Sequence, residues 1–214
     1  MTVPRLAAVG AAAAALALAA CSPAPPATGP APSAPATAAP TPPAEPGAAA
    51  AVFGPACDWL PQGDGPGSLA AMRRQPVATA VSANPLLTTL ATAVKAVPGL
   101  PDTLDNTQGL TVFAPSDDAF AALPRPTWQA LLKDTTKLDG LLSYHLVGQR
   151  YDAASLVAAE QATALAGGTL AIGGTATAPT VTDGQGDTAA VLCGNIPTAN
   201  ATVFVIDRVL MPKS

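Results

Sequence analysis

Two patterns of hydrophobic residues divide the chain beyond Phe53 into a helical part and a strand-rich part. As far as His145, apolar residues recur three or four positions apart, which is the spacing of amphipathic helices. Beyond Leu146 the apolar runs are short and separated by glycine, a pattern typical of strands joined by tight turns. Helices followed by a meander of strands predict an α+β domain with an antiparallel sheet.

Local start and stop signals define the individual elements. Asn84 followed by Pro85, for example, predicts the start of a helix. Helices are predicted over residues 69–74, 77–82 and 84–97, after Ser116, after Pro126, from Thr136 to His145, and over 152–157. Strands are predicted over residues 110–114, 162–166, 169–172, 175–178, near 181, and over 189–192, 196–199 and 202–210, with turns at Gly167-Gly168 and Asp183-Gly184.

The first twenty residues predict export. Arg5 precedes the apolar stretch Leu6–Ala20, which is too short to cross a hydrocarbon core of about 30 Å but fits a signal peptide. The stretch ends in Leu18-Ala19-Ala20-Cys21, which resembles a bacterial lipobox, where the cysteine is acylated and becomes the first mature residue. We therefore predict a lipoprotein signal peptide over residues 1–20 and lipidation of Cys21. An uncleaved anchor, or ordinary cleavage after the alanine-rich run, are the alternatives.

Residues 21–52 have the composition of a disordered linker. Ten prolines lie between Ser22 and Ala50, and Glu45 is the only charged residue there. Such a segment cannot bury enough apolar surface to offset the cost of ordering it. Extended polyproline chains rise about 3.1 Å per residue, so the 29 residues from Ser22 to Ala50 would reach roughly 90 Å at most. It is predicted to be a spacer, and its composition also resembles an O-glycosylated stalk, with candidate sites at Thr28, Thr37 and Thr41.

Residues 53–214 are long enough for one domain with its own core. The whole chain has 10 basic and 14 acidic residues, and loss of Arg5 with the signal peptide would leave nine basic residues. These are scattered, and only Arg73 and Arg74 are adjacent, so no basic stripe exists to bind a phosphate backbone. We therefore predict that nucleic acid is not a partner.

The cysteines predict a disulfide. If Cys21 carries lipid, Cys57 and Cys193 remain as an even pair in an oxidising envelope compartment. Metal binding by the two thiols is a poor alternative, because the chain has one histidine and neither cysteine belongs to a Cys-x-x-Cys pair. No metal and no cofactor are predicted.

Three segments, in this order, resemble a fasciclin (FAS1) domain: Thr111–Phe120 (TVFAPSDDAF), Tyr144–Val147 (YHLV) and Asn200–Pro212 (NATVFVIDRVLMP). Further segments resemble one branch of this family, the mycobacterial cell-surface and secreted immunogenic lipoproteins. They are Gly54–Cys57, Pro76–Ala80, Asn84–Leu87 and Cys193-Gly194. The resemblance implies the FAS1 fold over residues 53–214. That fold is a roughly seven-stranded antiparallel β-wedge or sandwich with several short helices packed alongside. The resemblance also implies a bridge between Cys57 and Cys193.

The chain departs from the family pattern at one turn. Many fasciclin domains carry Asn-Gly where this chain has Asn200-Ala201. A type I′ turn would place Ala201 at positive φ, which is unfavourable for alanine, so we expect a different local turn.

Tyr144 and His145 are the candidate binding residues, because the Tyr-His pair and the nearby surface are implicated in adhesion in the family. The alternative is that both side chains pack and hydrogen-bond between a helix and a strand. His145 is the only histidine, so any Ser-His-Asp arrangement must use it, and no Gly-x-Ser-x-Gly motif is present. No catalytic residue is predicted.

The leading hypothesis is a non-catalytic lipoprotein that faces the outside of the cell membrane, with a released or secreted form also compatible. Its monomeric head domain would bind matrix, host or envelope components. The second hypothesis is an envelope carrier of a lipid or small molecule, with an apolar cleft between helices and sheet. The third is a hydrolase centred on His145. A deep cavity lined by leucine and valine would favour the carrier, and a filled wedge would favour adhesion.

Overall fold

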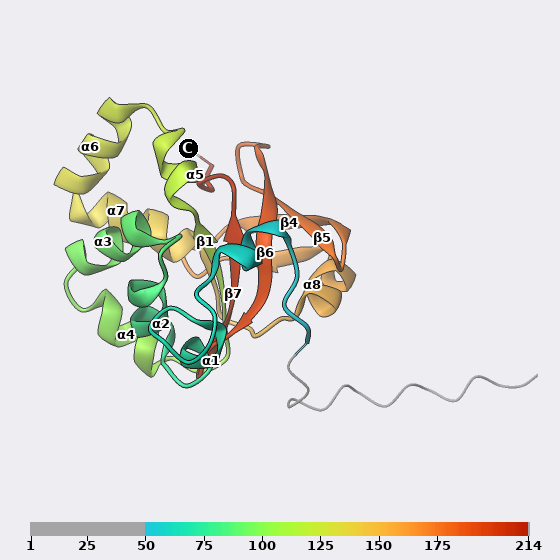
Figure 1. Cartoon of the computed structure of the whole chain (residues 1–214). Coiled ribbons are helices and arrows are strands. Elements are labelled where there is room, and N and C mark those ends of the chain that lie inside the picture. Colours follow the sequence, from blue (N-terminus) through green and yellow to red (C-terminus); the bar gives the residue numbers. More distant parts are fainter. Residues whose placement is uncertain (1–49, 214) are drawn as a thin grey trace, which may run out of the picture. The chain divides into compact units, whose positions relative to one another are not determined.

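The computed structural model shown in Figure 1 describes residues 50–213. The expected signal peptide, lipidated Cys21 and linker residues to 49, with Thr28, Thr37 and Thr41, lie outside the described residues. Across residues 50–213, none of the helices combines the length and the apolar character that a membrane span requires.

The described part contains one 3-10 helix, eight α-helices and seven strands. The helices are η1 Pro55–Trp59, α1 Leu69–Met72, α2 Val77–Ala83, α3 Thr88–Ala96, α4 Leu100–Asn106, α5 Asp117–Ala121, α6 Arg125–Lys133, α7 Thr135–Tyr144 and α8 Ala153–Ala159. The strands are β1 Leu110–Pro115, β2 Leu146–Val147, β3 Gln161–Thr163, β4 Thr169–Thr175, β5 Ala178–Thr182, β6 Thr188–Pro197 and β7 Ala201–Ile206.

All seven strands form one sheet in the order β2-β1-β7-β6-β5-β4-β3. The sheet is mixed, and the expectation of a wholly antiparallel sheet is wrong at one position, because β1 runs parallel to β7. The parallel register extends from Leu110 opposite Ala201 to Pro115 opposite Ile206. A parallel pair needs a long crossover connection, and here α5 to α8 and β2 to β6 supply it. The two ends of the sheet meet through a bridge between Val147 and Ala164, so the sheet nearly closes on itself.

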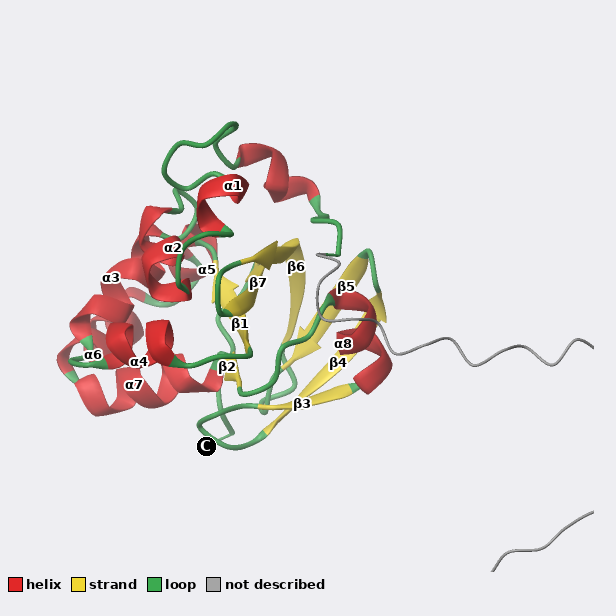
Figure 2. Cartoon of the chain, turned by 90° about the horizontal axis from the view of Figure 1, so that it is seen from below, coloured by secondary structure: helices red, strands yellow, loops and turns green. Residues whose placement is uncertain are grey.

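The two faces of the sheet bury two separate hydrophobic clusters. Helices α1 to α7 gather on one side of the sheet, whereas α8 lies apart against β3 and β4 (Figure 2). Alternate residues of β1 and β7 face the two clusters, so Val112 and Val203 belong to one and Phe113 and Phe204 to the other. Every residue of both strands is buried. Full burial of such side chains contributes roughly 1.5–3 kcal/mol each, which makes this strand pair the centre of the fold.

The segment by which the linker joins the domain is fixed to β6. The expected disulfide between Cys57 and Cys193 is present, with the Cα atoms 5.1 Å apart. Phe53 and Gly194 exchange two backbone hydrogen bonds, of 3.3 and 2.8 Å. Glycine at position 194 leaves room for the Phe53 ring, because a Cβ atom there would clash with the ring and displace it. The Asn195 side-chain amide donates to the carbonyl of Ala51 at 3.1 Å and accepts from the first N–H of α8.

Helix α3 begins at Thr88, three residues after the start that was predicted at Pro85. Asn84 accepts a hydrogen bond from Leu86 N–H in a local turn instead. The Asp117 carboxylate, from the start of α5, accepts the N–H groups of Thr88 and Thr89 and so caps α3 from outside the helix. Burial raises the pKa of Asp117, but the hydrogen bonds from Thr88 and Thr89 lower it more, and the pKa stays below its usual value.

The structure differs from the local predictions at three further places. Helix α4 was not predicted, and the strand expected over residues 175–178 is interrupted, because Ala176 and Thr177 form the hairpin turn between the end of β4 and the start of β5. The starts of α5 and α8 agree with the sequence signals, with Ser116 and Asp152 as N-caps. Thr136 was expected to cap α7, but Asp134 accepts the capping hydrogen bond instead.

Asn200 joins three elements that are distant in the sequence. Its side-chain oxygen accepts from Val77 N–H at 2.9 Å, and its amide donates to the carbonyls of Leu104 and Thr107, both at 2.7 Å. The side chain thereby ties the starts of α2 and β7 to the end of α4. Ala201 is not among the described residues with positive φ, and its N–H donates to Thr198 Oγ1, so the turn differs from type I′ as expected.

We predict that Asn200→Ala lowers the free energy of unfolding by about 3 kcal/mol, because it leaves several buried backbone groups without partners. Urea unfolding followed by circular dichroism would measure this. The control is Asn106→Ala, which removes one exposed hydrogen bond to the Asp102 carbonyl and should cost less than about 1 kcal/mol. Equal losses in the two variants would contradict the role assigned to Asn200.

Candidate functional site

Tyr144 and His145 lie side by side in sequence at the end of α7, where the chain turns into β2. Their exposed fractions are 1% and 3%, so neither side chain reaches the surface. The structure therefore agrees with the alternative interpretation, in which Tyr144 and His145 pack between a helix and a strand. A ligand could contact these two side chains directly only if the surrounding structure opened.

Hydrogen bonds to the backbone determine the state of the His145 ring. Nε2 lies 2.9 Å from the N–H of Leu210, which can only donate, so Nε2 accepts. Nδ1 therefore carries the proton and donates to the carbonyl of Leu141 at 2.8 Å. With both nitrogens used by backbone groups, the ring has none left to take a proton from a serine hydroxyl.

Burial keeps both side chains neutral. Desolvation lowers the pKa of His145 from 6.5 to about 4, although the hydrogen bond to Leu141 and the nearby Asp183 charge act in the opposite direction. Desolvation also raises the pKa of Tyr144, whose hydroxyl accepts the N–H of Gly184 at 2.9 Å. The pair is a neutral, hydrogen-bonded part of the core at physiological pH.

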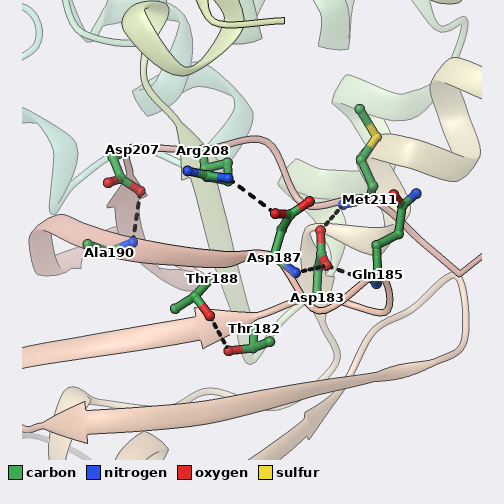
Figure 3. A network of polar contacts seen from close by, with 9 residues as sticks. All are labelled: Thr182, Asp183, Gln185, Asp187, Thr188, Ala190, Asp207, Arg208 and Met211. Carbon is green, nitrogen blue, oxygen red and sulfur yellow. Dashed lines mark hydrogen bonds and ion pairs between the residues drawn. The ribbon is translucent and has the colours of Figure 1, made fainter.

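The turn between β5 and β6 contacts Tyr144 through the N–H of Gly184, and it carries a buried carboxylate, Asp183, that the sequence marked only as a turn position. Figure 3 shows Asp183 with its contacts: Oδ1 accepts the N–H groups of Gln185 and Asp187, and Oδ2 accepts the N–H of Met211 at 2.8 Å. The network joins the turn to the C-terminal segment, next to Leu210. Exposed Asp207 accepts the N–H of Ala190 at 2.8 Å, which adds a further link to β6.

The cleft expected between helices and sheet is almost filled. An enclosed cavity of about 20 Å³ remains there, which is room for about one water molecule. Apolar side chains and His145 line it: Val77, Ala78, Val81, Leu90, Val94, Leu100, Leu104, Val112, Phe113, Leu142 and Leu146. A lipid chain does not fit this space without a rearrangement of the helices.

A larger, open groove lies on the surface of the helical layer. Its volume is about 520 Å³, and it runs between the turn that joins α3 to α4 and the outer side of α7. Its lining consists of Val97, Pro98, Gly99, Leu100, Thr103, Thr135, Thr136, Asp139 and Ser143. No sequence motif indicated it, because the two walls come from segments more than thirty residues apart. Among residues 50–213, no three metal-ligating side chains of His, Cys, Asp or Glu lie close enough to hold an ion.

We predict that protonation of His145 destabilises the domain as pH falls. The pKa of His145 is near 6.5 in the unfolded chain and about 4 in the folded one, so the unfolded chain binds the proton more readily. The contribution of His145 to the free energy of unfolding is fully present above pH 6.5. It declines as the pH falls toward 4, by at most about 1.4 kcal/mol per pH unit. Urea unfolding at several pH values, for the wild type and for His145→Gln, would measure it. The stability difference should shrink on acidification, and a constant difference would contradict the assignment.

Comparisons with known proteins agree with these structural features. The family model of the fasciclin domain matches residues 85–212. The cell surface glycolipoprotein MPB83 of Mycobacterium bovis is 38% identical over 187 residues, which cover 81% of each chain. The immunogenic protein MPT70 of Mycobacterium tuberculosis is 38% identical over 175 residues, covering 79% of this chain and 86% of that protein.

A solved structure shares the fold. A FAS1 domain pair from the insect cell adhesion molecule fasciclin I superposes with a TM-score of 0.54 at 18% identity. The match covers 64% of this chain and 51% of that one, so this chain spans about half of the domain pair. The family model, the identity to the mycobacterial proteins and the common fold all lead to one conclusion: this chain belongs to the fasciclin family.

Proposed function

We propose that the protein is a non-catalytic, lipid-anchored module that displays a FAS1 domain outside the cell membrane to bind matrix, host or envelope components. Residues 1–20 would be removed as a signal peptide, and acylated Cys21 would anchor the chain. The observation that carries the proposal is the 38% identity, over 81% of each chain, to a protein named as a cell surface glycolipoprotein. The lipobox-like sequence Leu18–Cys21 supports the same anchoring.

The attachment of the linker to the domain supports display. Residues 51–57 are bound to β6 by the disulfide, by the Phe53–Gly194 backbone pair and by Asn195. A domain held this way stays attached at a defined point of β6 when the linker is pulled. The name of MPB83, a glycolipoprotein, also supports glycosylation, for which Thr28, Thr37 and Thr41 in the linker remain the candidates.

The interior of the domain supports binding over transport and hydrolysis. The cavity of about 20 Å³ corresponds to a filled wedge, which favours an adhesive module over a lipid carrier. Both nitrogens of the single histidine are engaged by backbone groups, which disfavours the hydrolase hypothesis.

We predict that Cys21→Ala releases the protein from the membrane, because the acyl chains have no other attachment site in this proposal. Cell fractionation followed by immunoblotting would measure the distribution between membrane and soluble fractions. The matched control is Ser22→Ala, which should leave the protein in the membrane fraction. Globomycin should block maturation of the wild type. Membrane retention of Cys21→Ala, together with normal processing in globomycin, would refute lipid anchoring.

We predict that cells carrying the anchored protein attach to a surface coated with fibronectin or collagen more strongly than cells carrying Cys21→Ala. The reason is that adhesion requires the domain to be held at the cell surface. Counting attached cells after washing would measure the difference. If cells that retain the wild-type protein attach no better than cells without it, these matrix partners are excluded and envelope components remain.

A further inference from the structure

The open groove between the α3–α4 turn and α7 is preformed and has the volume that small ligands occupy. Its volume of about 520 Å³ lies within the range of roughly 300–1,000 Å³ found for ligand pockets. It is distinct from the enclosed apolar cavity, and only Leu100 borders both.

Both walls of the groove are held in place. Gly99 adopts a left-handed conformation, with φ of 80°, and its carbonyl accepts hydrogen bonds from the N–H and the hydroxyl of Thr103. Buried Val97 and Leu100 anchor this turn from below. On the other wall, Leu138, Leu141 and Leu142 fix α7 against the core. The groove therefore requires little reorganisation when a ligand binds, which lowers the cost of binding.

The polar groups on the α7 wall are free to bind a ligand. The hydroxyls of Thr135, Thr136 and Ser143 make no hydrogen bond with any described residue, unlike the hydroxyl of Thr103. Asp139 is half-buried, and its carboxylate forms neither a hydrogen bond nor an ion pair within residues 50–213. Three hydroxyls and one carboxylate thus face the groove without partners.

The charge of the lining selects among ligand classes. Among the described residues, Asp139 is the only charged one that lines the groove, and none of the lysines or arginines does so. A lone carboxylate repels phosphate, sulfate and carboxylate groups, so anionic ligands are disfavoured. A carboxylate can accept several hydrogen bonds, and a hydroxyl can both donate and accept, which matches the hydroxyl groups of a sugar. Exposed Pro98 supplies apolar surface for the C–H face of a sugar ring.

The groove lies on the opposite side of the domain from the attachment of the linker. Helices α4 and α7 lie on one side in both views, whereas the described chain begins at residue 50 on the side of β6 and α8 (Figures 1 and 2). If the domain is anchored through Cys21, which is the proposed function on which this point rests, the groove lies away from the point where the linker joins the domain.

We infer that this groove binds a neutral saccharide, with the Asp139 carboxylate and the hydroxyls of Thr135, Thr136 and Ser143 as the hydrogen-bonding groups. The inference refines the proposed function by naming a ligand class and a site. It also moves the binding surface from the buried pair Tyr144 and His145 to the outer face of α7.

Nuclear magnetic resonance of the full chain, labelled with ¹⁵N, tests the inference. Maltotriose and mannotriose serve as neutral probes, and a heparin-derived hexasaccharide and trilysine serve as anionic and cationic probes. A neutral trisaccharide should shift the amide signals of Gly99, Thr135, Thr136, Asp139 and Ser143 in a saturable way. Asp139→Asn should weaken this binding about five-fold, because the amide keeps an acceptor oxygen but loses the charge that strengthens its hydrogen bonds.

The matched control is Asp118→Asn, which removes an exposed carboxylate on α5 outside the groove and should leave the affinity unchanged. Signal dispersion in the same spectra shows whether each variant is folded, and Thr136→Val gives a second groove variant. The inference is overturned if neither neutral sugar shifts the groove signals, or if trilysine alone does so, which would indicate a cationic peptide. These outcomes do not depend on anchoring at Cys21, because the measurement is made in solution.

Discussion

The parallel pairing of β1 with β7 is the interaction on which the rest of the domain depends. The two strands are in register over six residue pairs, and every residue in them is buried. Their alternate side chains form the base of both hydrophobic clusters, with Phe113 and Phe204 on one face and Val112 and Val203 on the other. A parallel pair forces the intervening chain to cross the sheet. The arrangement of the helices α5 to α8 and of the remaining strands therefore follows from this one pairing.

Buried polar groups fix the two ends of β7 at a small number of points. Asn200 precedes the strand and ties it to α2 and α4. Beyond its other end, the N–H of Leu210 donates to His145, and the N–H of Met211 donates to Asp183. Each of these contacts satisfies a backbone group that would be costly to bury alone. The residues that make the chain recognisable as a fasciclin domain are therefore largely those that hold β1 and β7 in the core.

The segments typical of the family stabilise the fold, and a different set of residues is assigned to binding. Tyr144 and His145 are engaged by Gly184, Leu141 and Leu210, so they support the interior and not the surface. The unpartnered polar side chains that we assign to binding lie earlier on α7, between Thr135 and Ser143, and line the groove. The same helix thus contributes leucines to the core on one face and ligand-binding groups on the other. The linker attachment on β6 leaves that outer face uncovered.

The sequence by itself determined the local features. N-cap signals at Ser116 and Asp152, the strand-rich second half, the paired cysteines and the three fasciclin-like segments were readable because each depends on neighbouring residues or on composition. Only the tertiary structure decided the direction of β1 beside β7, the start of α3 under the Asp117 carboxylate and the burial of His145. It also created the groove, whose walls come from residues 97–103 and 135–143. These features depend on contacts between segments far apart in the chain, and no local pattern of residues specifies which distant groups will meet.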